Sequence, residues 1–331
     1  MQDWLEKPVF LSGATGFIGA SLYPKLVEEG LEVRCGTRNP QRAAHRMPGC
    51  DWVEFDVERP ETLAAALEGC GSAYYLVHQM QTGEGYRERE VQAAKAFLKA
   101  AEDAGVRRVV YLGGVEPSDN AEPSEHLASR LQTGRILRSS HLDGDKKVVT
   151  VELRASMIVG AGSASWKMVR DLAARLPMMV LPSWTQSRSQ PVFIDDVVSA
   201  LVGARGLKLD DSAWFDIPGP QTLTAEEILR QVAHILGHDF VSLPVPMLSP
   251  RVSSYWLRFV TRCDIYMARE LVDGLKTDLI AQDGRFWMFI NHPKRVPFEE
   301  AARRAVQASE PGSLLSRAYE GLVSKVSRSR I

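Results

Sequence analysis

Residues 12–19 read SGATGFIG and space three glycines, Gly13, Gly16 and Gly19, at intervals of three. An apolar run, PVFL at 8–11, precedes them, and FIGASLYPKLVEEG at 17–30 follows with helical periodicity. In a strand–turn–helix unit, the first glycine permits a sharp turn, the second lets the backbone approach a pyrophosphate, and the third lets helix and strand pack closely. The helix N-terminus adds free N–H groups and partial positive charge. This order predicts dinucleotide binding, whereas a glycine triplet alone also fits a structural turn.

The first half of the chain alternates between two patterns. Apolar, β-branched runs alternate with segments of helical periodicity, and the predicted strands are 8–13, 31–37, 51–57, 72–78, 106–114 and 148–160. Strands and helices that alternate at this spacing imply right-handed crossovers and a parallel sheet covered on both faces. We therefore expect an α/β fold, a doubly wound parallel sheet with a smaller C-terminal lobe over one edge of it.

The end of the second predicted strand indicates which dinucleotide binds. An acidic residue there would accept hydrogen bonds from the adenine ribose of NAD, but the chain has Thr37, Arg38 and Asn39. A guanidinium pairs with a 2′-phosphate in a forked geometry, which favours NADP(H) over NAD(H). The alternative is that Arg38 is an ordinary surface arginine.

The expected cofactor contacts follow successive strands. Asp56 and Val57 would flank the adenine, while Val77 and His78 would lie along the diphosphate and ribose. His78 fits a structural histidine equally well. The full predicted set is Gly13, Thr15, Gly16, Phe17, Ile18, Gly19, Thr37, Arg38, Asp56, Val57, Val77, His78, Gly113, Arg130 and Ser156.

Composition excludes several classes of function. The chain has 331 residues and a formal net charge of −1, so no basic field attracts nucleic acid. We expect no signal peptide, no transmembrane segment and a cytoplasmic location. Four cysteines, Cys35, Cys50, Cys70 and Cys263, lack metal-ligand spacing, so we expect reduced thiols and no metal.

Several motifs together resemble one known family. SGATGFIG, Arg38, the Asp56–Val57 pair, LRASMIVGAG at 153–162 and PVFIDDVVSAL at 191–201 resemble the short-chain dehydrogenase/reductase superfamily, in its extended and atypical branches, which include NmrA-like and epimerase-like proteins. The resemblance covers residues 8 to about 220 well. It implies an NADP-binding Rossmann domain at 1–161 and a mainly substrate-binding lobe at 162–331, with short segments near 191–220 returning to the first domain. Substrate would bind over the nicotinamide, between the two.

The catalytic positions depart from the superfamily's pattern. Relatives carry Tyr-x-x-x-Lys on the helix after the fifth strand and a Ser or Thr at that strand's end. This chain has His126-x-x-x-Arg130 on that helix, and the strand ends at Gly113 and Gly114. Imidazole is a competent acid or base near neutral pH, whereas arginine stays charged. His126 is therefore a candidate proton donor, and Arg130 a candidate contact for the cofactor.

The resemblance also suggests a substrate wall and leaves two functions open. The predicted wall residues are Gly114, Met157, Trp166, Trp184 and Arg188, a mixture that suits a mainly apolar ligand with a polar end, although Met and Trp more often simply pack. One hypothesis is an NADPH-dependent reductase of a small carbonyl or enone compound. The other is a non-catalytic NADP(H)-binding redox sensor or assembly protein. Either is compatible with a homodimer or a protein partner.

Overall fold

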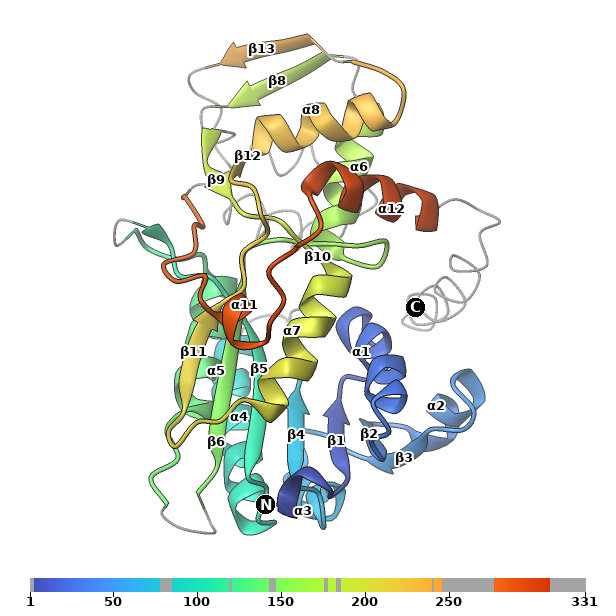
Figure 1. Cartoon of the computed structure of the whole chain (residues 1–331), viewed down its shortest axis with the longest axis vertical. Coiled ribbons are helices and arrows are strands. Elements are labelled where there is room, and N and C mark those ends of the chain that lie inside the picture. The colour runs from blue at the N-terminus through green and yellow to red at the C-terminus, as the bar shows by residue number, and fades with distance from the viewer. Residues whose placement is uncertain are drawn as a thin grey trace.

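A seven-stranded parallel sheet forms the centre of the molecule (Figure 1). The computed structural model describes residues 3–77, 85–118, 121–142, 147–175, 178–182, 186–239, 241–245 and 277–309. The strand order is β11-β6-β5-β4-β1-β2-β3, and every neighbouring pair runs parallel. The strands are β1 (Val9–Ser12), β2 (Val33–Thr37), β3 (Asp51–Glu54), β4 (Ser72–Tyr75), β5 (Arg108–Gly114), β6 (Val149–Ala155) and β11 (Ala213–Asp216). The predicted doubly wound fold is confirmed.

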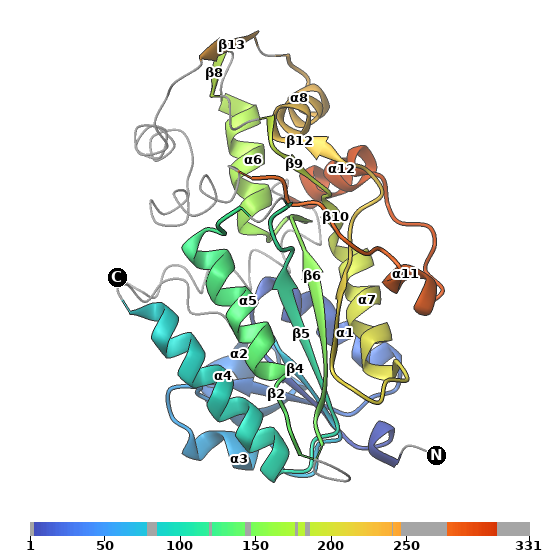
Figure 2. The same cartoon turned by 90° about the vertical axis from the view of Figure 1, so that its left-hand side faces the viewer.

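Helices cover both faces of this sheet (Figure 2). One layer contains α3 (Glu61–Leu67), α4 (Tyr86–Asp103) and α5 (Glu125–Leu137), and the other contains α1 (Phe17–Glu28) and α7 (Ile194–Gly206). A separate apolar cluster fills each interface, one around Phe10, Phe97 and Tyr111, the other around Leu22, Val110 and Leu201. Burial on both faces explains why the strand sequences are continuously apolar rather than alternating.

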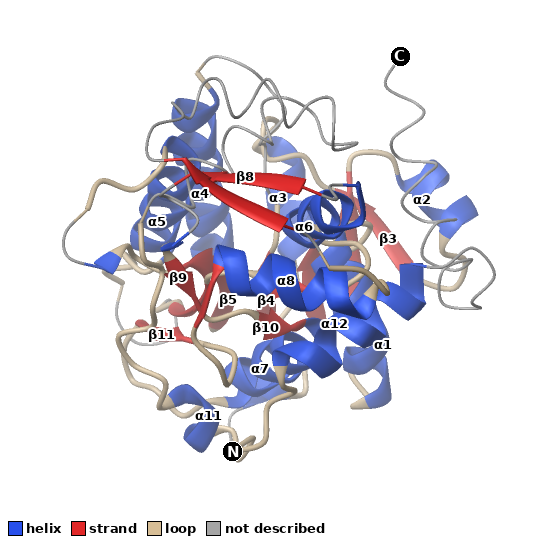
Figure 3. Ribbon diagram, turned by 90° about the horizontal axis from the view of Figure 1, so that it is seen from above, coloured by secondary structure: helices blue, strands red, loops and turns tan. Residues whose placement is uncertain are grey.

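A smaller group of elements lies beyond the carboxyl ends of the strands (Figures 1 and 3). Its helices are α6 (Ala164–Arg175), α8 (Ala225–Ile235) and α12 (Phe298–Ser309). Its short strands are β7 (Ile158–Val159), β8 (Met178–Pro182), β9 (Arg188–Ser189), β10 (Val192–Phe193), β12 (Leu223–Thr224) and β13 (Val241–Val245). This lobe therefore stands over the edge of the sheet at which Rossmann proteins bind their ligands.

Two buried carboxylates attach residues 277–309 to the rest of the molecule. Asp196, at the start of α7, accepts hydrogen bonds from His292 Nε2 at 2.8 Å and from the Val296 amide at 2.9 Å. Asp216, at the end of β11, accepts one from the Gln282 amide at 2.7 Å. Both side chains are almost fully buried, so these hydrogen bonds compensate for the solvation that the side chains lose.

Local structure departs from the sequence pattern at several points. Residues 148–160 form two strands, β6 and β7, rather than one. Residues 178–182, soon after the end of α6, form strand β8. A further short helix, α2 (Pro40–Arg46), follows β2 and is capped by the Asn39 side chain. Among the helices of the described ranges, none is long and apolar enough to cross a membrane.

Candidate functional site

The predicted cofactor residues gather at one edge of the sheet. Gly13 follows β1, Thr37 ends β2, Val77 follows β4, Gly113 lies at the end of β5, and Ser156 follows β6. Because these strands are parallel and adjacent, their carboxyl ends meet at the same edge. Segments as far as 143 positions apart, from Gly13 to Ser156, thus form one line beneath the C-terminal lobe.

The glycine loop has the close contacts that its spacing predicts. Gly13 has φ +65°, and a Cβ there would lie 2.8 Å from the Leu76 carbonyl oxygen. Gly19, in the first turn of α1, faces the loop so closely that a Cβ would lie 2.3 Å from the Gly13 carbonyl oxygen. The Ser12 hydroxyl donates to the Tyr74 carbonyl at 2.8 Å and accepts from the Leu76 amide at 2.8 Å, which joins the ends of β1 and β4. The loop is tight, leads into a helix N-terminus and fits a dinucleotide.

A basic cluster follows β2. Arg38 is exposed and is succeeded by α2, whose Arg42, His45 and Arg46 line an open pocket with Asn39 and Gln41. Burial, with a smaller contribution from the neighbouring Arg42 charge, lowers the pKa of the Arg46 guanidinium. Positive groups that already repel one another provide a favourable environment for an added phosphate. Arg46 was not identified in the sequence, because α2 is too short to give a clear periodic signal.

The remaining predicted contacts are used partly for structure. The Asp56 backbone amide donates to Thr62 Oγ1 at 3.0 Å, and Val57 is buried in the core. The Ser156 hydroxyl donates a hydrogen bond to the Gln190 carbonyl and accepts one from the Gln190 amide, each at 3.1 Å. It thus joins the end of β6 to the segment between β9 and β10.

His126 and Arg130 project from the first turns of α5. Ser124 caps this helix by accepting from the Leu127 amide, and His126 is partly buried. Arg130 donates from Nη2 to the Leu112 carbonyl oxygen, and its guanidinium carbon lies 5.8 Å from the centre of the Tyr111 ring. The Tyr111 hydroxyl in turn donates to the Arg130 carbonyl at 3.1 Å. The start of α5 is thereby attached to the carboxyl end of β5.

Neighbouring side chains fill the space beside Gly113 and Gly114. A Cβ on Gly113 would lie 3.0 Å from Glu152 Oε1, and one on Gly114 would lie 2.5 Å from Leu127 Cδ1. A serine at either position would require a neighbour to move. The packing around Gly113 and Gly114 therefore leaves no room for the Ser or Thr that relatives carry at the end of this strand.

The Glu152 side chain is fully buried between β6 and α5. It accepts from Arg138 Nε at 2.8 Å and from Arg154 Nε at 3.0 Å. A Cβ on Gly134 of α5 would lie 2.3 Å from this carboxylate. Arg154 lies 4.3 Å from the centre of the Trp214 ring, which extends the network to the edge strand. These charges fix the position of α5 against the sheet.

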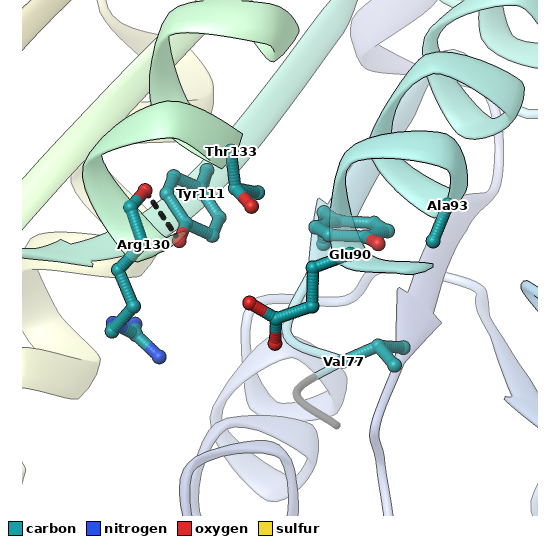
Figure 4. Close-up of a pocket in the computed structure, with 7 residues that line it drawn as sticks. Val77, Glu90, Ala93, Tyr111, Arg130 and Thr133 are labelled. Carbon is teal, nitrogen blue, oxygen red and sulfur yellow. Dashed lines mark hydrogen bonds between the residues drawn. The ribbon is translucent and has the colours of Figure 1, made fainter. Parts of the chain in front are cut away.

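A small pocket lies between α4 and α5 beside these residues (Figure 4). It is lined by Tyr75, Val77, Glu90, Ala93, Tyr111, Arg130 and Thr133, and has room for about one water molecule, with a volume of about 10 Å³. Glu90 is 7% exposed and accepts a hydrogen bond from the Ser129 hydroxyl. Glu90 is not among the predicted site residues, although it is an acid at a core-facing position of its helix.

The predicted substrate residues have different surroundings. Trp166 is fully buried in the apolar core, and Met157 packs partly against it. Arg188 is paired with Asp278, with a shortest distance of 2.6 Å. His78 and Trp184 lie outside the described residues.

Known proteins resemble the part of the chain that contains the glycine loop. Residues 13–157 match a family described as NAD(P)H-binding. A 3-beta-hydroxysteroid dehydrogenase of Mycolicibacterium neoaurum is 26% identical over 67% of this chain, and the match spans 61% of that relative's length. A ceramide reductase of Caulobacter vibrioides is 27% identical over 72% of this chain and 74% of its own. These similarities extend well past the glycine loop.

Solved structures share the fold at lower identity. A triphenylmethane reductase of a Citrobacter species, complexed with NADP(H), covers 90% of this chain and 99% of its own, with a TM-score of 0.71 and 16% identity. A UDP-glucose 4-epimerase of Thermotoga maritima covers 91% of this chain and 97% of its own, with a TM-score of 0.64 and 14% identity. Reductases and epimerases thus share this architecture, and the residues that match the NAD(P)H-binding family, 13–157, include the glycine loop.

Proposed function

We propose that this chain, which contains an NAD(P)H-binding domain, is an oxidoreductase that uses NADPH to reduce a small, mainly apolar carbonyl or enone compound. The observation that carries the proposal is the convergence of the glycine loop, Arg38, His126 and Arg130 on the carboxyl edge of one parallel sheet. The curated relatives named as a steroid dehydrogenase and a ceramide reductase support oxidation and reduction as the reaction class.

The basic cluster after β2 supports NADPH as the preferred cofactor. Arg38 and Arg42 are exposed, and the residues at the end of β2, Thr37 to Asn39, include no acid. A 2′-phosphate bound there would therefore accept charge-assisted hydrogen bonds from these arginines. Such bonds contribute about 1.5–3 kcal/mol each, so Arg38→Ala should weaken NADPH about tenfold or more and leave NADH unchanged. Calorimetric titration of both nucleotides at low ionic strength measures this, with Arg303→Ala on α12 as the control. Equal affinities of the wild-type protein for NADPH and NADH would contradict the assignment.

We assign proton transfer to His126 and cofactor positioning to Arg130. Bound NADPH would supply the hydride. The His126 imidazole, at the start of α5, then provides a proton to the substrate oxygen. Arg130 is held by the Leu112 carbonyl and the Tyr111 ring, so its charge stays at the carboxyl end of β5. His126→Phe should reduce turnover by about 100-fold or more, in line with general acid catalysis, while nucleotide affinity stays unchanged.

A panel of ketones, aldehydes and enones with aliphatic, aromatic and sterol-like side chains tests the substrate class. NADPH oxidation is followed by absorbance. Turnover of the apolar members, with little activity on sugar nucleotides, is the expected result. Activity confined to sugar nucleotides would instead favour the epimerase-type reaction.

A non-catalytic role is the second candidate, and one observation favours it. The positions at which relatives carry a hydroxyl are Gly113 and Gly114, and Glu152 and Leu127 fill the adjoining space. A redox sensor needs cofactor binding but no proton donor. It predicts no turnover with any member of the panel, together with a protein partner whose binding differs between NADP⁺ and NADPH.

A further inference from the structure

Glu90 occupies an unusual place on α4. The face of this helix that meets the sheet consists of Ala93, Ala94, Phe97 and Ala101, which recur at helical spacing and are almost fully buried. Glu90 continues the same face one turn earlier and is only 7% exposed. A carboxylate at a core position is costly to bury, so its surroundings must compensate for lost solvation.

One hydrogen bond of Glu90 comes from the neighbouring helix. The Ser129 hydroxyl of α5 donates to the Glu90 carboxylate, and Glu90 faces the pocket that Arg130 lines from the other side (Figure 4). Val77, the residue after the end of β4, closes the same pocket. The carboxylate is therefore fixed beside the residues expected to contact the cofactor.

The topology determines which half of a dinucleotide reaches this pocket. The glycine loop after β1 takes the pyrophosphate, and Arg38 and Asp56 follow β2 and β3 on one side of it. In this fold the cofactor crosses the sheet at the point where the strand order reverses, so the nicotinamide half extends to the other side, over β4 and β5. The pocket is built from these two strands and the helices that cover them.

Two phenols, one carboxyl group and one guanidinium are the ionisable groups that line the pocket. Burial raises the pKa of Tyr111 to about 12, with smaller contributions from the Glu152 and Glu90 carboxylates, while Arg130 acts against it. Burial also raises the pKa of Tyr75. Both phenols stay neutral near pH 7. The charged groups that line the pocket are the Glu90 carboxylate and the Arg130 guanidinium.

We propose that Glu90 sets the relative affinity of this site for the oxidised and reduced cofactor. The inference rests on the proposed NADP(H) binding and concerns the same site. The nicotinamide ring carries a positive charge in NADP⁺ and none in NADPH. A fixed, buried carboxylate at the nicotinamide end attracts only the charged ring, because low local polarity strengthens the interaction. Glu90 is thus a specificity-determining residue and not a proton donor.

The test compares two glutamates on one helix. Glu102 also accepts a serine hydroxyl, from Ser140 at 2.7 Å, but it lies twelve residues from Glu90, about 18 Å along α4. Glu90→Gln removes one charge and keeps an oxygen that accepts from Ser129, and Glu102→Gln makes the same change at the far end. Affinities for NADP⁺ and NADPH are measured by calorimetry for the wild-type protein, both variants and Glu90→Asp, which retains the charge.

Glu90→Gln should weaken NADP⁺ about tenfold, equivalent to about 1.4 kcal/mol, and leave NADPH within about twofold of the wild type. Glu102→Gln and Glu90→Asp should keep the wild-type ratio. If Glu90→Gln weakens both forms equally, or changes neither, Glu90 only joins two helices and the inference is wrong. If the wild-type protein binds neither nucleotide, the proposed function itself fails. Should Glu90→Gln not fold, a changed ratio in Glu90→Asp would also overturn the inference.

Discussion

Replacing Gly19 with alanine tests the glycine loop most directly. The added Cβ would lie 2.3 Å from the Gly13 carbonyl oxygen and 2.7 Å from the Ala14 Cα. Both are backbone atoms, so no side chain can rotate away. The Cβ and the Gly13 oxygen, 2.3 Å apart as built, reach a separation of 3.0 Å only if the loop and the helix move apart by about 0.7 Å. A hydrogen bond of about 2.9 Å that lengthens by this amount falls outside the effective range.

The expected loss follows from this displacement. Hydrogen bonds to a charged phosphate contribute about 1.5–3 kcal/mol each, so losing two weakens NADPH by about 3 kcal/mol or more, over 100-fold. Calorimetry measures the affinity, and circular dichroism confirms that the chain is folded. Gly206→Ala is the matched control, because a Cβ at the end of α7 meets nothing within 4 Å. Binding by Gly19→Ala within threefold of the wild type would refute the reasoning.

Three further predictions concern the packing around the site. Gly134→Ala should lower the free energy of unfolding, measured in urea, by about 1–2 kcal/mol. The added Cβ overpacks against the buried Glu152 carboxylate, and this cost exceeds the gain in helix propensity. A more stable variant would contradict this. Burial raises the pKa of the Cys35 thiol, so peptide mass spectrometry should find it alkylated at pH 8 only after denaturation. Asp196→Asn should increase hydrogen exchange at the Val296 amide, whereas unchanged protection would show that this bond contributes little.

The sequence predicts the features of this molecule that depend on short spacings. The three glycines of the loop lie within residues 13–19, and each predicted strand or helix is one continuous stretch of sequence. Asp195 and Asp196 lie in the first turn of α7, which begins at Ile194 with Phe193 at the N-cap position. Asp196 therefore does not cap the helix, and its side chain accepts hydrogen bonds from His292 and the Val296 amide instead.

The parts that could not be predicted depend on distant pairs. Glu152 is unremarkable within a strand, and only the fold places Gly134 against it. Glu90 did leave a signal, since it is the acid in an otherwise apolar stripe on α4, but its partner Ser129 lies 39 residues away. The predicted roles of His126 and Arg130 rest on their place in the fold, and their chemistry stays a prediction.

The contacts of Asp196 and Asp216 have a consequence for how the molecule could be divided. Each carboxylate belongs to the sheet-bearing part, yet its partners come from residues 282–296, more than 60 positions later. A fragment that stopped before residue 277 would keep every strand of the central sheet and leave two buried acids without these partners. The part of the chain that forms the central sheet is therefore not a transferable module. A chimera that exchanges the C-terminal lobe has to keep residues 282–296 together with Asp196 and Asp216. If it omits that segment, it needs neutral residues in place of the two acids.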